Sequence, residues 1–468
     1  MDKNIFGFTE ITSPNLYDFF PKSLQNVLLK KMVLNSAKNK AYWLLDSLKG
    51  GLIKRNYKEI KLGVEKPNSE LAITNQKNHL ERLLAHTTAS TPFYKAFRNN
   101  TNLSDFPVIR KTDIQDNFEA FRSETYRNAK NFEVSTSGST GVPFFLYQDF
   151  GKRRRNRADV IYFSEEAGYI IGNRLYELEV WRSHNKKNNF KSRLQNIVQF
   201  DISRLTDKRI EEFLGLLKSS NQDKKSLLGF ASAYELIAQF MEKNDISLKN
   251  VGIVSAIANS EYLNPFTKTT LSKRLNTSVL SRYSSEEIGI IAQQTLKSPN
   301  DFVLNHSSYK IELLDFESDN PVKPGEFGRI VVTDLFNYAM PMIRYDTGDI
   351  AKMSLNPEGA MTFEQIEGRK MDLIYDSSGN IISSFVVYTK FYKYYQLLKQ
   401  YQFIQQGEKE YEIKLNIQGD KFEYEKQLIE DVKSDFGADA NVYITYVDEI
   451  PPLSSGKRRK VVNNYNKD

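Results

Sequence analysis

The sequence lacks cysteine entirely, which excludes disulfide bridges, thiolate metal ligands and a cysteine-bound acyl intermediate. Histidine is nearly as scarce, because its four copies are scattered along the chain, and such scatter predicts no zinc site. No apolar run approaches the ~20 residues that a membrane-spanning helix needs, so no membrane span is expected. The first residues lack a basic start followed by an apolar stretch, so no signal peptide is expected either.

A strong excess of one charge is also lacking over most of the chain. Lys and Arg total 65 against 58 Asp and Glu, a net charge of +7. Residues 457–468 contain five basic residues and one acidic residue, so the rest of the chain is nearly neutral. A nucleic-acid-binding protein usually presents a broad basic face, whereas this chain has two short basic runs, at 152–155 and 457–460. We therefore expect no nucleic-acid partner, and keep that class as the less favoured alternative.

The order of the hydrophobic patterns predicts an α/β protein with several parts. Strands alternate with helices over about 130–300, which is typical of a mainly parallel sheet covered by helices. Strands and turns over about 301–366 predict a small antiparallel or barrel-like subdomain. We expect a helical extension (1–75), a large domain of mixed sheets with covering helices (76–368), and a small, mobile α+β lid domain (369–468).

Residues 135–143 (Ser-Thr-Ser-Gly-Ser-Thr-Gly-Val-Pro) form a loop rich in glycine and hydroxyl groups after a predicted strand. The glycines let the backbone come close to phosphate oxygens, and the hydroxyls of Ser137, Ser139 and Thr140 add donors. The loop is not a Walker motif, because it has no Gly-Lys-Ser/Thr. It predicts a phosphate-binding site, with an ordinary surface turn as the alternative.

Two further segments place carboxylates where a nucleotide would need them. Residues 283–287 (Tyr-Ser-Ser-Glu-Glu) lie at the end of a predicted strand, and a carboxylate there suits Mg²⁺, which one or two carboxylates usually hold together with phosphates. Residues 344–349 (Arg-Tyr-Asp-Thr-Gly-Asp) end in Asp349, and a carboxylate can accept hydrogen bonds from both ribose hydroxyls. The alternatives are an acidic helix start and a hairpin turn, respectively.

Two segments near the C-terminus carry positive charge. Residues 368–372 (Gly-Arg-Lys-Met-Asp) contain Arg369, whose delocalised charge can reach a ribose or a phosphate. Residues 452–457 (Pro-Leu-Ser-Ser-Gly-Lys) end in Lys457, a point charge on a flexible stem that can approach a carboxylate and an α-phosphate together. A plain turn and a disordered basic tail are the respective alternatives.

The order and spacing of these five segments resemble those of the adenylate-forming ligases, in particular the phenylacetate–CoA ligase-like and capsular polysaccharide biosynthesis branch. The resemblance covers about residues 78–461. It implies that Tyr283 stacks on adenine, that Glu287 binds Mg²⁺ and that Asp349 binds the ribose. The ATP- or AMP-binding residues that it implies are Thr136, Ser137, Gly138, Ser139, Thr140, Gly141, Tyr283, Ser285, Asp349 and Arg369, and the catalytic residues are Glu287 and Lys457.

The resemblance implies an enzyme that activates a small carboxylic acid with ATP and Mg²⁺. The acid attacks the α-phosphorus, pyrophosphate leaves, and the acyl group then passes to an acceptor while the C-terminal domain turns about residues 369–372. The default acceptor is the thiol of CoA. Transfer to an amine or a sugar in capsule or surface polysaccharide biosynthesis, and a non-catalytic nucleotide-binding relative, are the alternatives. We expect a cytoplasmic protein, where ATP and CoA are found, and the sequence leaves a homodimer open.

Four residues depart from the family pattern. Phe144 stands where many members have lysine, Ser284 replaces a glycine, and Glu286 replaces a threonine. We hypothesise that the arginines at 153–155 supply the positive charge that Phe144 does not. Residues 259–262 (Asn-Ser-Glu-Tyr) resemble a Gly-Glu turn that borders adenine in the family, with serine in place of the glycine.

Overall fold

The computed structural model describes residues 35–100, 102–136, 144–181, 189–220, 224–316, 318–369, 374–382, 386–387, 390–391, 393–394, 397–451 and 459–465. Its strands are β1 (Phe132–Thr136), β2 (Phe144–Gln148), β3 (Arg174–Glu179), β4 (Ile197–Asp201), β5 (Lys225–Phe230), β6 (Ile253–Asn259), β7 (Val279–Ser285), β8 (Gly289–Gln293), β9 (Phe302–Leu304), β10 (Tyr309–Leu314), β11 (Phe327–Asp334), β12 (Tyr345–Leu355), β13 (Met361–Arg369), β14 (Ile374–Tyr375), β15 (Ile381–Ile382), β16 (Leu398–Gln405), β17 (Glu410–Ile417), β18 (Asn441–Tyr446) and β19 (Val461–Asn463).

The α-helices are α2 (Asn35–Leu48), α3 (Leu52–Glu65), α4 (Glu70–Ser90), α5 (Lys111–Asp116), α6 (Phe150–Glu165), α7 (Asn189–Gln195), α8 (Asp207–Ser219), α9 (Ala231–Lys243), α10 (Pro265–Leu275) and α12 (Glu425–Phe436). Four short 3₁₀ helices lie before the first strand: η1 (Pro92–Phe97), η2 (Leu103–Asp105), η3 (Phe118–Phe121) and η4 (Glu124–Tyr126). Within the described ranges, no helix is both long and apolar enough to cross a membrane.

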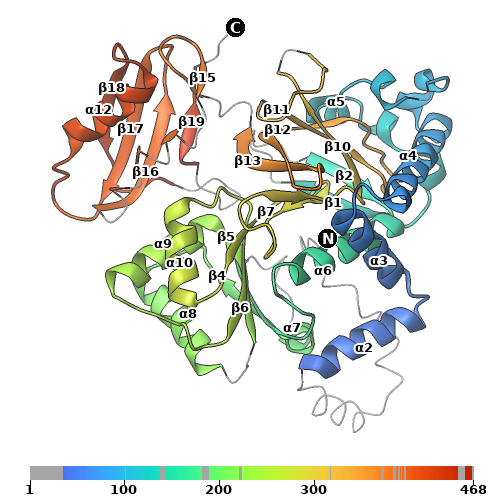
Figure 1. The fold of residues 1–468 in the computed structure, drawn as a ribbon, viewed down its shortest axis with the longest axis horizontal. Coiled ribbons are helices and arrows are strands. Elements are labelled where there is room, and N and C mark those ends of the chain that lie inside the picture. The colour runs from blue at the N-terminus through green and yellow to red at the C-terminus, as the bar shows by residue number, and fades with distance from the viewer. Residues whose placement is uncertain are drawn as a thin grey trace.

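An eleven-stranded sheet dominates the fold, in the order β10-β11-β12-β13-β9-β8-β7-β6-β5-β3-β4 (Figure 1). Strands β3 to β7 pair in parallel with their neighbours, whereas β8 to β13 pair antiparallel. The two halves meet at β7, which pairs in parallel with β6 and antiparallel with β8. The predicted α/β fold class with a mainly parallel sheet over about 130–300 is therefore confirmed.

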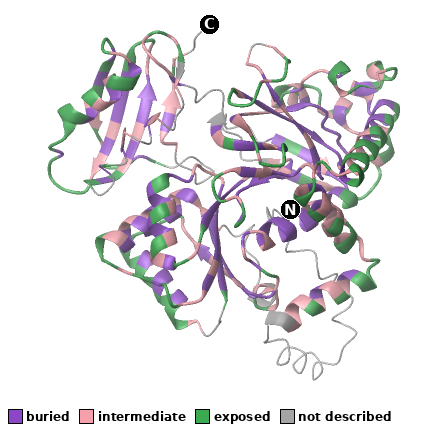
Figure 2. Ribbon diagram, in the orientation of Figure 1, coloured by how far each residue is buried: buried purple, intermediate pink, exposed green. Residues whose placement is uncertain are grey.

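The parallel half is buried on both faces, so most residues of its strands are buried, including polar ones such as Glu177 and Arg282 (Figure 2). Helices α8, α9 and α10 pack on one face, and α6 packs on the other together with α3. Successive side chains of β5 point to opposite faces of the sheet. Leu227 packs with α8, α9 and α10, whereas Leu228 packs with α6 and α3. The sequence pattern of 266–275 predicts a helix, and this helix is observed as α10, which begins one residue earlier.

The antiparallel half curls back on itself. The hydroxyl of Tyr309, on β10, donates to the carbonyl of Ile288, between β7 and β8, over 2.8 Å. In a flat sheet the five steps from β10 to β8 would separate these strands by about 24 Å, at ~4.8 Å per step. The contact therefore requires a barrel-like curl, in agreement with the small barrel-like part predicted for 301–366. A separate apolar core fills this half.

The helices before the first strand pack against the large sheet. The Ser69 hydroxyl accepts the Ala72 N–H and caps α4. The Thr-Pro step at 91–92 predicts the end of a helix, and α4 does end at Ser90, just before it. Helix α3 packs on α6, so part of the predicted extension 1–75 is attached to the large sheet.

The basic run at 152–155 lies on α6 and one of its arginines faces inward. Arg155 is fully buried: its Nη1 lies 2.8 Å from Glu59 Oε1, its Nε donates to Ser308 Oγ over 2.8 Å, and its Nη2 donates to the Ser307 carbonyl over 2.8 Å. These donors are used inside the fold, where they tie α3 and the loop before β10 to α6. The hypothesis that residues 153–155 offer charge to a phosphate is therefore wrong for Arg155.

A four-stranded sheet in the order β18-β17-β16-β19 forms the C-terminal part, with α12 packed against it. A glycine at 437 predicts the end of a helix, and Gly437, with φ of 111°, does end α12. An ion pair between Lys460 and Glu235 joins this part to α9. The α+β character is as predicted, while the boundary at 368/369 and the division into three domains stay predictions.

We predict that Glu59 stabilises the fold only above acidic pH. Burial alone raises the pKa of Glu59, but its hydrogen bond with His79 and the charge of Arg155 outweigh burial and lower the pKa from 4.5 to about 2. A carboxylate with a lowered folded-state pKa contributes stability that is complete above 4.5 and is lost as the pH falls to about 2. Urea unfolding should therefore show wild type more stable than Glu59→Gln at pH 7, with the gap closing between pH 4.5 and 2. A gap that is independent of pH would contradict this.

Candidate functional site

The end of β7 and the start of β12 meet inside the curled half of the sheet. The Tyr283 hydroxyl donates to Asp349 Oδ2 over 2.7 Å and lies 3.2 Å from Thr347 Oγ1. Thr347 Oγ1 in turn donates to the Ile330 carbonyl over 3.0 Å, so the part of β12 before Asp349 is held in place. Two segments that were predicted to bind different parts of one nucleotide therefore share a hydrogen-bonded cluster.

Glu287 lies in the turn between β7 and β8 and is held at both its carboxylate and its backbone. The Tyr345 hydroxyl donates to Glu287 Oε1 over 3.3 Å. The Gln148 amide donates to the Glu287 carbonyl over 3.2 Å. Ser285 Oγ, predicted to bind nucleotide, accepts the Ile288 N–H over 3.3 Å and closes the turn.

The two tyrosines orient the two carboxylates. Burial raises the pKa of Tyr283, and the nearby Asp349 carboxylate raises it further. Burial and then the Glu287 carboxylate raise the pKa of Tyr345. Both hydroxyls therefore stay protonated at neutral pH and keep donating. A carboxylate offers about four acceptor sites, more than one tyrosine hydroxyl can use, so each can also serve a ligand.

Strand pairing places two more predicted residues at the ends of strands. Asp349 on β12, which is predicted to bind the ribose, is the cross-strand partner of Arg369 on β13, which is predicted to bind the ribose or a phosphate. The backbones of these two residues therefore lie side by side. Thr136, the last residue of β1, is the partner of Phe144, the first residue of β2. The two ends of the predicted phosphate loop are therefore held together by the β1–β2 hairpin.

Several predicted site residues lie outside the described residues. These are Ser137, Gly138, Ser139, Thr140, Gly141 and Lys457, and for Thr136 and Arg369 only the backbone is described. The binding and catalytic roles of all the predicted site residues stay predictions.

The position of Phe144, where many family members have lysine, is apolar but lies near a cation. The Phe144 side chain is 1% exposed. Lys111, the first residue of α5, places its ammonium 5.3 Å from the centroid of that ring. A positive charge from another element of the fold thus lies at the start of β2, which the sequence pattern did not indicate.

The 259–262 segment adopts the backbone conformation that its resemblance implies. Ser260 has φ of 67°, in the left-handed region that glycine adopts most readily, which explains why a glycine suits this position. Glu261 Oε2 accepts the Ser232 N–H over 2.8 Å near the start of α9. The segment therefore connects the end of β6 to the first turn of α9.

Sequence reasoning missed Tyr345 and Gln148. Tyr345 lies within the 344–349 segment, but nothing in the pattern said that its hydroxyl would reach Glu287. Gln148 ends β2, whose exposed and buried positions alternate so that Gln148 is buried on the same face as Phe144 and Leu146. A polar residue in register with buried apolar ones was the signal that could have indicated a buried hydrogen bond.

The sequence is similar to those of known proteins. The CapK C-terminal domain family matches residues 374–464. Protein CapK of Staphylococcus aureus is 23% identical over 471 residues, which cover 96% of this chain and 99% of that protein.

Solved structures share the fold. The 2-hydroxyisobutyryl-CoA ligase in the postadenylation state, in complex with 2-HIB-AMP, matches with a TM-score of 0.67 and 15% identity over 85% of this chain and 90% of that chain. ATP-bound MatB from Rhodopseudomonas palustris matches with a TM-score of 0.52 and 15% identity over 70% of this chain and 66% of that chain. The predicted resemblance to adenylate-forming ligases and to the CapK branch is confirmed, and at these identities the solved structures establish the fold.

We predict that the Tyr283 hydroxyl contributes more to stability than a buried tyrosine hydroxyl bonded to a neutral group. Tyr411 is the matched control, because its hydroxyl makes a part-buried bond of the same 2.7 Å length to the neutral Tyr375 carbonyl. Tyr283→Phe should lower the free energy of unfolding by about 1.5–3 kcal/mol, and Tyr411→Phe by about 1 kcal/mol, because hydrogen bonds to charged groups are stronger. Equal losses in urea unfolding would show that the Asp349 contact is not a charge-assisted bond.

Proposed function

We propose that this protein activates a carboxylic acid with ATP, forming an acyl-adenylate and releasing pyrophosphate, and then transfers the acyl group to an acceptor. The observation that carries this proposal is the cluster in which Tyr283 bonds to Asp349 and Tyr345 bonds to Glu287. These two bonds connect segment 283–287 with segment 344–349, which carry the carboxylates assigned to Mg²⁺ and to ribose. The fold is shared with the 2-hydroxyisobutyryl-CoA ligase in complex with 2-HIB-AMP.

Asp349 accepts hydrogen bonds from the ribose hydroxyls, and Tyr283 offers its ring to adenine. The 2.7 Å bond between the two side chains keeps ring and carboxylate in a fixed relation, so base and sugar are positioned together. Arg369, the cross-strand partner of Asp349, approaches the same ribose or its phosphate. This orientation aligns the α-phosphorus for in-line attack by the carboxylate.

The residues present fit Mg²⁺ better than a metal held entirely by protein. Among the described residues, no group of three or more His, Asp or Glu side chains could hold a metal ion. Mg²⁺ usually takes one or two carboxylates and completes its shell with phosphates and water, which suits Glu287 next to a triphosphate. When bound, Mg²⁺ neutralises charge on the phosphates as pyrophosphate leaves.

Lys457 brings its ammonium to the attacking carboxylate and the α-phosphate, where negative charge develops. The C-terminal part then turns about residues 369–372, so that Lys457 leaves and the acceptor reaches the acyl carbon. The acceptor's nucleophile attacks that carbon, the bond to the phosphate oxygen breaks, and AMP departs. Closing the site in both steps protects the anhydride from water.

The acceptor is the thiol of CoA by default, as in the ligases that share the fold. Similarity to CapK along nearly its whole length favours one specific alternative, transfer to an amine or a sugar in capsule or surface polysaccharide biosynthesis. The substitutions at Phe144, Ser284 and Glu286 support a further alternative, a relative that binds nucleotide without catalysis. Pyrophosphate release separates catalysis from binding.

We predict acid-dependent exchange of pyrophosphate into ATP. Wild type is assayed with aryl, fatty, amino and uronic acids, and one acid class should support exchange. Lys457→Ala should lower the exchange rate about 100- to 1000-fold, because it removes the charge that stabilises the transition state, while ATP binding is retained. Binding of ATP without exchange for any acid would favour the non-catalytic alternative.

We predict that Glu287, and not its neighbour Glu286, sets the requirement for Mg²⁺. Glu287→Gln should raise the Mg²⁺ concentration for half-maximal exchange by roughly 10-fold or more, because an amide is a much poorer ligand for a hard cation. Glu286→Gln is the matched control and should change it by less than about 2-fold. An equal shift in both variants would mean that the two carboxylates share the metal.

A further inference from the structure

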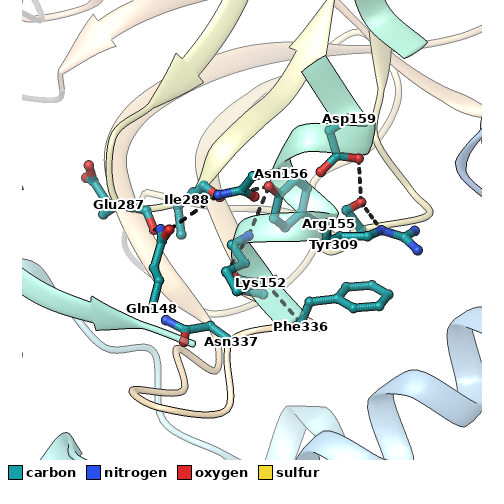
Figure 3. Close-up of polar contacts among 12 residues, drawn as sticks. Gln148, Lys152, Arg155, Asn156, Asp159, Glu287, Ile288, Tyr309, Phe336 and Asn337 are labelled. Carbon is teal, nitrogen blue, oxygen red and sulfur yellow. Dashed lines mark hydrogen bonds and ion pairs between the residues drawn. The ribbon is translucent and has the colours of Figure 1, made fainter. Parts of the chain in front are cut away.

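Two buried side chains bond to the backbone of the turn that carries Glu287, and two more hold one of them in place. Gln148, at the end of β2, donates to the Glu287 carbonyl over 3.2 Å, and Tyr309, on β10, donates to the next carbonyl, that of Ile288, over 2.8 Å. Figure 3 shows both side chains reaching this turn from other elements, while the Glu287 carboxylate points away from them. The turn is therefore held on the side opposite the Glu287 carboxylate.

The Tyr309 hydroxyl has a fixed orientation because it is hydrogen-bonded on both sides. It donates to the Ile288 carbonyl and accepts from the ammonium of Lys152, on α6, over 3.2 Å. The same ammonium lies 4.7 Å from the centroid of the Tyr309 ring. A hydroxyl that donates and accepts in this way cannot rotate without losing a bond in a site that water does not reach.

Lys152 is itself held by a buried ion pair. Its ammonium lies 2.7 Å from Asp334 Oδ2, and both side chains are 0% exposed. The other oxygen of Asp334 accepts the Phe336 N–H over 3.1 Å. A buried ion pair adds little stability over apolar residues of similar size, so stability alone does not account for a pair at this place.

The turn has no room to shift towards Tyr309. Gly289 has φ of 112°, and a Cβ at this position would lie 2.7 Å from the Tyr309 hydroxyl. The backbone and the hydroxyl are thus as close as a glycine allows. Helix α6 and strand β2 directly follow the predicted phosphate loop in the sequence, so the same contacts tie that part of the chain to the turn.

We propose that Gln148, Lys152, Tyr309 and Asp334, here called the turn clamp, are positioning residues for Glu287. This inference rests on the proposed function, in which Glu287 binds the Mg²⁺ of ATP. None of the four touches the Glu287 carboxylate. They fix the backbone from which it projects, and hence its distance from the triphosphate, which must be accurate for a metal ligand.

The central test is Tyr309→Phe, which keeps the ring and removes the hydroxyl. The Mg²⁺ concentration for half-maximal ATP–pyrophosphate exchange should rise about 10-fold, as for residues that orient metal ligands, while the KM for the acid changes less than about 2-fold. Tyr234→Phe is the matched control, because Tyr234 is buried and its hydroxyl has no hydrogen-bond partner within the described ranges. It should leave both quantities unchanged. A fall in the exchange rate with unchanged Mg²⁺ dependence would overturn the proposal.

A double-mutant cycle distinguishes positioning from general loss of structure. If Tyr309 acts through Glu287, Tyr309→Phe should shift the Mg²⁺ dependence little once Glu287→Gln is present, because the group being positioned is gone. Additive shifts would overturn the proposal. The paired substitution Lys152→Met with Asp334→Leu removes both buried charges together, so neither is left unpaired, and it should shift the Mg²⁺ dependence in the same direction as Tyr309→Phe.

Different experimental results would contradict the turn clamp and the proposed function. If wild type supports no exchange with any acid, the proposed reaction fails, and the Mg²⁺ dependence of ATP binding is then followed by calorimetry. The clamp predicts the same rise of about 10-fold for Tyr309→Phe and none for Tyr234→Phe in that measurement. Identical Mg²⁺ dependence in wild type and Tyr309→Phe would overturn the clamp whatever the reaction.

Discussion

The hydrogen bond between the Tyr283 hydroxyl and the Asp349 carboxylate is the contact on which the candidate site depends. Strands β7 and β12 are four steps apart in the sheet, about 19 Å if the sheet were flat, yet these side chains lie 2.7 Å apart. The contact exists only because the antiparallel half curls into a barrel-like shape. The curl in turn is filled by its own apolar core, so packing and site geometry depend on each other.

Helix α6 supports the same curl through the ion pair and hydrogen bonds of its buried basic side chains. It carries the run Lys-Arg-Arg-Arg at 152–155, yet most of the helix is buried. Both Lys152 and Arg155 point into the protein. Lys152 forms an ion pair with Asp334, and Arg155 bonds to Glu59 and two serines. A helix with internal cations can connect elements from three regions of the chain, which an apolar helix would do with less directional precision.

Much of the fold could be predicted from the sequence because the signals were local. The apolar period of 266–275, the Thr-Pro step after α4 and the glycine after α12 each specify an element or its end through nearest neighbours. The alternation of strands and helices was enough to predict a parallel sheet. These features need no knowledge of how distant segments approach one another.

The parts that could not be predicted depend on contacts between distant segments. The sequence of a basic run does not indicate whether its side chains face solvent or a buried carboxylate. The structural role of Arg155 could therefore not be predicted. Tyr345 and Gln148 reach Glu287 only through the curl and through the register of the β1–β2 hairpin. Motif order predicted which residues belong together, but only the strand order explains how Asp349 comes to lie against Tyr283.

The central claim is that a carboxylate attacks the α-phosphorus of ATP, and isotope transfer tests it most directly. The acid that supports exchange is labelled with ¹⁸O in its carboxylate and turned over with ATP and the acceptor, and the products are weighed by mass spectrometry. We expect one carboxylate oxygen in AMP and none in pyrophosphate, because the anhydride breaks at the acyl carbon. Label in orthophosphate with formation of ADP would contradict the account, because the attack would then fall on the γ-phosphorus.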